Sequence, residues 1–594
     1  MEKYEDWSEV YPRPQLRRDR FLPLTKGWKR NGKALRVPWE HTTEKHMVYE
    51  LSFDLPEEYA RIVRTYAGMR EKRILLHFGA VDQVCSLTVN GQAVGSHAGG
   101  YLPFSFDVTE LLKERENRLV LTVADTLDKS YGYGKQSRRP HGMWYTQVSG
   151  IWQPVWLEAV PARGRVERLR ITPDLAGIDL EIETEAAAGG IRGALPGEPV
   201  RYEALVEVLD AKGSVILQRE EALKDRIRIR LDPEQPHLWM PEDPYLYGLR
   251  IRTRRLRASK EAQEAGEDIA DTVMSYFALR TVTLERRGRH LHPCLNGKAI
   301  FLNGVLDQGY FEDGFYLPAD PREYRRDILR MKEMGFNLLR KHLKIEPEVF
   351  YYECDRQGML VLQDMVSSGH YSFLFETALP TLISKTRTFR PLPKIAPRRH
   401  RIFLREMKGT MDLLYNHPCI VGYTIFNEGW GQFRADRLYD RGKQYDPTRF
   451  YDSTSGWFRG ERSDVRSEHI YFRNEVLPPA PADQFLLLSE CGGYSRAVPG
   501  HMTKVRRRYG YGRTDSEEAL TRRIAEMYEE MVLPSIANGL SGVVLTQLSD
   551  VESEINGLYT FDRAVCKVNA GKLRELAERV YAAAAEVASE NMET

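Results

Sequence analysis

The feature that most constrains the fold is a change of rhythm near residue 286 of the 594-residue chain. From there on, apolar β-rich runs alternate with helical stretches, and eight strand candidates lie at 299–308, 337–342, 360–365, 420–428, 450–456, 468–472, 485–490 and 542–550. Asp320 as N-cap, Pro321 at the first helical position and Gly335 at the close delimit one helix, and 347–358 and 515–539 repeat this pattern. Eight such units predict a (β/α)8 TIM barrel. The alternative is an open doubly wound sheet, although no GxGxxG motif follows a strand.

The first half of the chain consists of shorter alternating runs that need no long helix. Asn90-Gly91, placed between two apolar runs, is a strong signal for a tight β-hairpin. We therefore predict a β-sandwich over residues 1–160 and a smaller, immunoglobulin-like sandwich over 161–285. The barrel domain then occupies 286–594.

Composition narrows the possible partners and the compartment. The 86 basic and 84 acidic residues nearly cancel, which gives no indication of a nucleic-acid or anionic-membrane partner. No run is apolar enough to span a membrane, and the N-terminus lacks the apolar segment of a secretory signal. The six cysteines are scattered and form no CxxC pair, which indicates free thiols in a reducing compartment. We expect a cytoplasmic protein.

Polar residues stand at the predicted carboxyl ends of the barrel strands, where side chains face the active-site mouth. They are Asp307, Gln308, Arg340, His342, Asp364, Asn427, Glu428, Glu490, Gln547 and Asp550. Glu428 and Glu490 are the most informative, because each ends a long apolar run and a buried carboxylate is costly without a partner or a task. Two carboxylates that face each other across a barrel mouth are the equipment for cleaving a glycosidic bond.

Such a pair divides the work between an acid and a nucleophile. One carboxyl keeps its proton for the departing oxygen, the other stays ionised, and their mutual repulsion separates the two pKa values. A separation of about 5 Å leads to a covalent intermediate and retained stereochemistry, whereas a wider one admits a water and inverts it. The sequence leaves this separation open.

Several motifs resemble glycoside hydrolase family 2, the family of β-galactosidases, β-glucuronidases and β-mannosidases. The resemblance rests on "SGIWQPVWLE" (149–158), "FLNGVLDQGYFEDGFY" (301–316), "NLLRKH" (337–342), "NHPCIVGYTIFNEGWGQ" (416–432) and "LLLSECGG" (486–493). It implies a jelly-roll sandwich, an immunoglobulin-like sandwich and a TIM barrel, in that order. It also implies a retaining mechanism with Glu428 as acid/base, Glu490 as nucleophile, Asn427 on the sugar 2-hydroxyl and Arg340 near the nucleophile.

Other candidates have a plainer interpretation beside the functional one. His342, Asp364, His469 and Tyr471 lie near strand ends and are either pocket residues or satisfied core residues. Trp430 and Trp457 either stack on a sugar face at the mouth or pack loops. Asp307 follows the first strand, a position that suits a carboxylate that binds a sugar hydroxyl. Gln547 ends the eighth strand, which lacks the aromatic residue common there in many relatives.

The chain shows no sign of a metal or cofactor requirement, because it has no HExxH motif, no tight His/Asp cluster and no phosphate-binding loop. Structural magnesium or sodium, which some relatives use, stays open.

The segment 366–400 is long for a βα connection and carries Lys385, Arg387, Arg390, Lys394, Arg398 and Arg399. It is either a solvated lid or a contact for an acidic substrate or a neighbouring subunit. Relatives often form dimers or tetramers, so a homo-oligomer is possible.

The resemblance makes a terminal β-galactoside the default substrate, with β-glucuronidase, arabinosidase and β-galactofuranosidase activities as alternatives. Family members that cleave glucuronides carry an Asn-x-Lys pair that grips the uronate carboxylate. This motif is not evident in "AVCKVNAGKL", which follows "VESEINGLYTFDR". A different class, a carbohydrate-binding protein without catalysis, is disfavoured because a binding-only pocket gains little from two adjacent anions.

Overall fold

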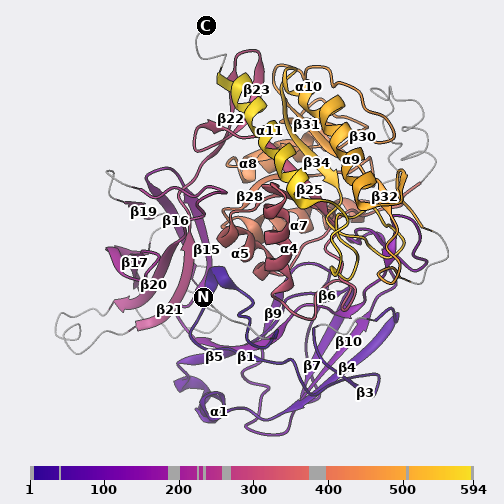
Figure 1. The fold of residues 1–594 in the computed structure, drawn as a ribbon. Coiled ribbons are helices and arrows are strands. Elements are labelled where there is room, and N and C mark those ends of the chain that lie inside the picture. Colours follow the sequence, from indigo (N-terminus) through magenta and orange to yellow (C-terminus); the bar gives the residue numbers. More distant parts are fainter. Residues whose placement is uncertain are drawn as a thin grey trace.

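The chain forms two β-sandwiches and a barrel (Figure 1). The computed structural model describes residues 6–38, 42–184, 201–223, 227–231, 236–256, 269–372, 397–503 and 508–589. In Figure 1 the N-terminal sandwich lies below the barrel, and the second sandwich lies beside the two. The predicted order of a jelly-roll sandwich, an immunoglobulin-like sandwich and a TIM barrel is confirmed.

The N-terminal sandwich packs a four-stranded sheet against a six-stranded sheet around its own apolar core. The first sheet has the order β1 (Leu22–Pro23), β14 (Val155–Pro161), β5 (Lys72–Phe78) and β9 (Phe104–Asp107). The second has the order β3 (Lys33–Leu35), β2 (Trp28–Arg30), β4 (His46–Phe53), β10 (Asn117–Ala124), β7 (Val84–Val89) and β8 (Gln92–Ala98). Asn90 and Gly91 form the predicted tight turn between β7 and β8, both with positive φ, as a type I′ turn requires.

The second sandwich pairs a three-stranded sheet with a four-stranded one. The first contains β15 (Val166–Pro173), β16 (Gly177–Thr184) and β19 (Ile227–Arg230). The second contains β18 (Val215–Ala222), β17 (Arg201–Leu209), β20 (Tyr247–Leu256) and β21 (Ile269–Phe277). Alternate residues of β16 and β21 are buried, as expected for strands with one face on a core.

The barrel is a parallel sheet of eight strands that is nearly closed, since its end strands β29 and β30 contact each other. In spatial order the strands are β29 (Phe450–Asp452), β28 (Ile420–Thr424), β27 (Leu360–Asp364), β26 (Leu338–Lys341), β25 (Leu302–Asp307), β34 (Leu540–Thr546), β31 (Phe485–Gly492) and β30 (Val465–Ile470). The helices are α4 (Glu323–Glu333), α5 (Glu348–Gln357), α7 (Pro397–Leu414), α8 (Ala435–Tyr445), α9 (Glu517–Met527), α10 (Leu533–Ile536) and α11 (Ala570–Ser589). All eight strand candidates are therefore present, and the doubly wound alternative is wrong.

The structure corrects three details of the predicted barrel. No helix lies between β29 and β30 or between β30 and β31, two stretches that are described throughout, so not every unit is a full β/α unit. Helix α4 begins at Glu323, because Asp320 accepts a hydrogen bond from the Arg322 amide in a turn ahead of the helix. Regular pairing of the fourth strand ends at Thr424, and Asn427 makes only an isolated bridge to Ser455.

The cysteines are free thiols, as predicted, and all except the half-buried Cys566 are buried. Within the part of the chain that the structure describes, no helix has both the length and the apolar character needed to cross a membrane.

Candidate active site

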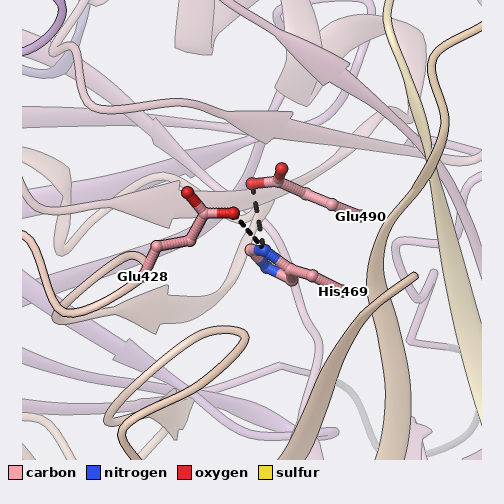
Figure 2. A group of neighbouring side chains, drawn as sticks. All are labelled: Glu428, His469 and Glu490. Carbon is pink, nitrogen blue, oxygen red and sulfur yellow. Dashed lines mark hydrogen bonds and ion pairs between the residues drawn. The ribbon is translucent and has the colours of Figure 1, made fainter. Parts of the chain in front are cut away.

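Glu428 and Glu490 lie next to each other at the carboxyl end of the barrel (Figure 2). Glu428 follows β28 in a backbone conformation with φ of 50°, held by a hydrogen bond of 2.9 Å from its amide to the Ser455 carbonyl. Glu490 lies near the end of β31. Each residue is 6% exposed, and one carboxylate oxygen of each lies within 4.8 Å of one oxygen of the other.

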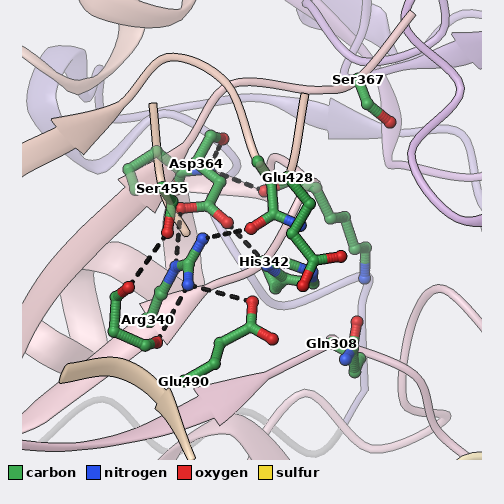
Figure 3. A network of polar contacts seen from close by, with 12 residues as sticks. Gln308, Arg340, His342, Asp364, Ser367, Glu428, Ser455 and Glu490 are labelled. Atoms are coloured by element: carbon green, nitrogen blue, oxygen red, sulfur yellow. Dashed lines mark hydrogen bonds and ion pairs between the residues drawn. The ribbon is translucent and has the colours of Figure 1, made fainter. Parts of the chain in front are cut away.

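Arg340 of β26 holds the Glu490 side of the site together (Figure 3). It is fully buried and donates through Nη1 to Glu490 Oε1 at 3.1 Å and through Nη2 to Asn427 Oδ1 at 2.9 Å. Its Nε donates to Asp364 Oδ1 at 3.1 Å, and the other Asp364 oxygen contacts His342 Nδ1 at 2.6 Å. The guanidinium thereby fixes three predicted site residues, Glu490, Asn427 and Asp364, and Asp364 in turn fixes His342.

His469 contacts both glutamates (Figure 2). Its Nδ1 is 2.9 Å from Glu428 Oε1, and its Nε2 is 3.7 Å from Glu490 Oε1 and 2.8 Å from Ser455 Oγ. Tyr471 donates its hydroxyl to Glu490 Oε2 at 2.6 Å. Both residues therefore contact the glutamates directly.

These surroundings drive the two carboxyl pKa values apart. Burial raises the pKa of Glu428, and the charge of Glu490 raises it further, against the hydrogen bond from His469. Burial would also raise the pKa of Glu490, but the nearby positive charges of His469 and Arg340 outweigh it and lower that pKa well below its ordinary value. The arrangement thus favours a proton on Glu428 and a charge on Glu490.

Among the predicted site residues, three buried polar atoms have no partner in the described part of the chain. They are Asn427 Nδ2, His342 Nε2 and Trp430 Nε1. Because Asp364 accepts the Nδ1 proton of His342, and burial lowers the pKa of this imidazole to about 4, His342 Nε2 is a hydrogen-bond acceptor. Leaving buried polar atoms unpaired is costly, so two unpaired donors and one unpaired acceptor among these residues indicate a polar ligand.

The remaining candidates have identifiable contacts. Trp430 stacks on Trp144 with ring centroids 5.3 Å apart, and Trp457 meets the His469 ring edge-on at 5.6 Å. Asp307 forms an ion pair with Lys341 and accepts the Gly309 amide.

Gln547 lies in a hydrogen-bond chain of its own. It accepts from Gln308 at 2.9 Å and donates to Asn556 at 2.8 Å. The recorded partners of Asp307 and Gln547 are therefore residues other than the two glutamates.

Sequence reasoning did not single out four residues of this region. Lys135 and Trp144 belong to the N-terminal sandwich and reach the barrel mouth only through the tertiary fold. Tyr511 stacks on Tyr471 at 3.9 Å, and Ser455 bonds His469. Ser455 lies inside a predicted strand end, "FYDSTSG", and could have been inferred from it; no comparable signal marks the other three.

Glu428, His469 and Glu490 form the one group within the described residues whose geometry could hold a metal ion. Here the imidazole contacts both carboxylates directly, so a cation would have to displace these contacts. Of the basic segment 366–400, residues 373–396 lie outside the described part, and with them Lys385, Arg387, Arg390 and Lys394. Arg398 is exposed and lies 3.8 Å from Asp128, whereas Arg399 is buried and donates to the carbonyls of Ser368 and Gly431.

A TIM barrel with two facing carboxylates at the carboxyl ends of its strands has the architecture of a glycoside hydrolase. Comparison with known families gives the same class: residues 34–161 match the glycosyl hydrolases family 2 sugar binding domain, 164–265 match glycosyl hydrolases family 2, and 290–480 match the family 2 TIM barrel domain. The chain belongs to glycosyl hydrolase family 2.

Individual relatives carry two different names. A β-galactosidase of Pectobacterium atrosepticum is 27% identical over 415 residues, which are 68% of this chain and 36% of that protein. A Bifidobacterium dentium β-glucuronidase, solved in complex with coumarin-3-O-glucuronide, superposes with a TM-score of 0.71 at 19% identity and covers 95% of this chain and 98% of its own. A Dictyoglomus thermophilum β-D-glucuronidase superposes with a TM-score of 0.70 at 17% identity, and the superposition covers 96% of this chain and 98% of that one. The alignments span only 33–39% of the curated relatives' length.

Proposed function

We propose that this chain is a retaining exo-glycoside hydrolase that releases a terminal sugar by double displacement. The observation that carries the proposal is the pair of buried carboxylates whose nearest oxygens lie within 4.8 Å and whose pKa values are displaced in opposite directions. This spacing suits the separation of about 5 Å used by retaining enzymes rather than the wider gap that admits a water.

In the first step, Glu490 attacks the anomeric carbon and forms an ester bond to the sugar. The glycosidic C–O bond breaks at the same time, and Glu428 gives its proton to the departing oxygen. In the second step, Glu428, now ionised, takes a proton from water, and the water oxygen attacks the anomeric carbon and releases Glu490. Arg340 and Tyr471 each donate to one oxygen of Glu490, which holds that carboxylate ionised and aligned for the attack.

The unpaired atoms around the pair provide contacts for sugar hydroxyls. Asn427 Oδ1 is held by Arg340, so the side-chain amide is oriented with Nδ2 free to donate. We assign this donor to the 2-hydroxyl, where a hydrogen bond strengthens as positive charge develops on the sugar ring. His342 Nε2 accepts from a second hydroxyl, and Trp430 Nε1 donates to another polar atom.

The glycone has two leading candidates. A β-galactoside is the expectation from the resemblance and is the name of one group of relatives. A β-glucuronide is favoured by the names of the structural neighbours. However, the chain contains Asn-x-Lys only at Asn31–Lys33 and Asn296–Lys298, both in hairpin turns, so a uronate carboxylate would need a different cation.

The test is a panel of p-nitrophenyl glycosides, namely β-galactopyranoside, β-glucopyranoside, β-glucuronide, α-arabinofuranoside and β-galactofuranoside. Proton NMR of the first-formed product establishes whether the anomeric configuration is retained. Turnover with retention supports the proposal, and inversion contradicts the assignment of Glu490 as nucleophile. Binding of sugars without hydrolysis of any member would support the carbohydrate-binding alternative instead.

A further inference from the structure

Lys135, contributed by the N-terminal sandwich, is a buried cation beside the two glutamates. The side chain is only 8% exposed, and its Nζ lies 5.8 Å from the ring centroids of both Trp430 and Tyr145. Its positive charge contributes to lowering the pKa values of Glu428, Glu490 and His342. We propose that Lys135 is a specificity-determining residue that binds a carboxylate on the sugar, so that the preferred substrate is a β-linked uronide.

Among the described residues, the Lys135 ammonium group has no anionic partner. Within the described part of the chain, Lys135 Nζ makes no hydrogen bond or ion pair, and it lies over the aromatic rings of Tyr145 and Trp430. By contrast, the other buried lysines among the described residues each contact a carboxylate; they are Lys341, Lys344 and Lys567. A buried ammonium without a hydrogen-bonded anion is costly, and cation–π contacts recover only part of the cost. The missing anion is supplied when an acidic substrate binds.

The segment that carries Lys135 is held firmly against the barrel. Tyr133 donates its amide and its hydroxyl to the carbonyls of Ser367 and Gly369, each at 2.9 Å. On the other side of Lys135, the Thr146 amide donates to Glu552 at 2.8 Å. Anchored on both sides, the lysine is positioned before substrate arrives, which reduces the entropic cost of using a long side chain.

A purely electrostatic role is the competing explanation. Lys135 lowers the pKa of both glutamates through its charge, so it could serve only to balance them. The two explanations differ in what they predict for substrates. Charge balancing affects every glycoside alike, whereas binding of a carboxylate affects only substrates that carry one. His342 does not compete for this anion, because its imidazole is neutral and its unpaired Nε2 is a hydrogen-bond acceptor rather than a donor.

The inference rests on the proposed function, and its experiment uses two substrates that differ at one group. β-Glucuronide and β-glucoside of p-nitrophenol share every hydroxyl orientation and differ in a carboxylate against a hydroxymethyl group. Lys135→Met should lower kcat/KM for the glucuronide by about 10- to 100-fold, mainly through KM, which is the range for a hydrogen bond to a charged group. The glucoside should change less than about threefold, and Lys135→Arg should keep most of the preference.

Lys129→Met is the matched control, since this lysine lies in the same segment and covers the Tyr133 ring at 5.3 Å. It should leave both substrates unaffected. Equal losses on both substrates in Lys135→Met, or a wild-type enzyme that prefers the glucoside, would overturn the inference while leaving the hydrolase proposal intact.

A binding measurement keeps the inference testable without turnover. Calorimetry with Glu490→Gln should show p-nitrophenyl β-glucuronide binding more tightly than the glucoside, and addition of Lys135→Met should abolish the difference. If the wild type hydrolyses no glycoside, the hydrolase proposal fails, but this calorimetric difference still decides the role of Lys135. Equal binding of the two compounds contradicts it.

Discussion

Two buried charge clusters lie side by side in the barrel, and they differ in how completely their groups are paired. The first surrounds Arg340, which contacts Glu490, and it includes Glu428 through His469. The second surrounds Lys341, the next residue of the same strand, whose Nζ contacts Asp307 and Glu346. Successive side chains of a strand point to opposite faces, so neighbours in sequence serve different regions. Lys341 packs over the Phe350 ring of α5, at 4.2 Å from its centroid.

The Lys341 cluster is self-sufficient. Glu346 accepts from Lys341, from Lys344 and from the Tyr324 hydroxyl, and Lys344 also donates to the carbonyls of Gly309 and Tyr316. Two cations face two carboxylates, and each has several partners. The Arg340 cluster instead leaves Asn427 Nδ2 and His342 Nε2 unpaired. A buried charge cluster with unpaired donors and acceptors indicates a binding site, whereas one whose groups are all paired needs no ligand to satisfy it.

The largest effect is expected when the Arg340 cluster loses its nucleophile. Glu490→Ala should lower kcat by at least about 10⁴-fold, as removal of a covalent nucleophile does, while the protein stays folded. Added azide should restore turnover of an activated aryl glycoside and give the glycosyl azide of inverted configuration. Steady-state kinetics measures the loss of kcat and its rescue by azide, and circular dichroism checks that the variant is folded. Wild-type activity in this variant would exclude Glu490 as the nucleophile.

The Lys341 cluster should show the opposite behaviour. Glu346→Ala deprives two buried ammonium groups of their shared carboxylate, and breaking a buried ion pair costs about 3–5 kcal/mol of unfolding free energy. Urea unfolding measures this loss, and kcat per folded molecule should change little. A variant with normal stability and lost turnover would erase the distinction between the clusters.

Glu428→Ala sharpens the assignment of the acid. Loss of general acid catalysis costs about 10²–10⁴-fold for substrates with poor leaving groups. A dinitrophenyl glycoside, whose leaving group needs little protonation, should lose far less in its first step. A series of aryl glycosides of graded leaving-group pKa makes the comparison. Equal losses along the series would contradict the role of Glu428.

The smallest effect concerns pH. His469 lowers the pKa of Glu428 by its hydrogen bond and that of Glu490 by its charge. His469→Gln should therefore raise both pKa values. Activity requires Glu490 ionised and Glu428 protonated, so both limbs of the kcat/KM profile should move to higher pH. A shift of either limb to lower pH would show that His469 acts differently.

The sequence predicted the parts of the molecule that depend on local pattern. Apolar runs bounded by turns located all eight barrel strands, and polar residues at their ends identified the Arg340 cluster, including Asp364 and His342. Strand periodicity did not reveal the partner of each polar residue: Asp307 pairs with Lys341, and its role as a hydroxyl-binding carboxylate stays a prediction.

Contacts between domains lay beyond sequence reasoning. Lys135 stands in the N-terminal sandwich, far along the chain from the glutamates, and only the docking of its segment on the barrel brings it to the site. The helix-free connections around β30 were missed for a different reason, since a repeated β/α pattern was extended over two stretches without helical periodicity.

The central claim is that Glu490 forms a covalent bond to the sugar while Glu428 handles the proton. The most direct measurement incubates the protein with a 2-deoxy-2-fluoro glycosyl fluoride of the preferred glycone, which slows both steps but the second more, and locates the label by peptide mass spectrometry. The account predicts one fluoroglycosyl group per chain, attached to Glu490 and absent from Glu490→Gln. Labelling of Glu428 or another residue, or rapid turnover of unmodified substrate with no label formed, would contradict it.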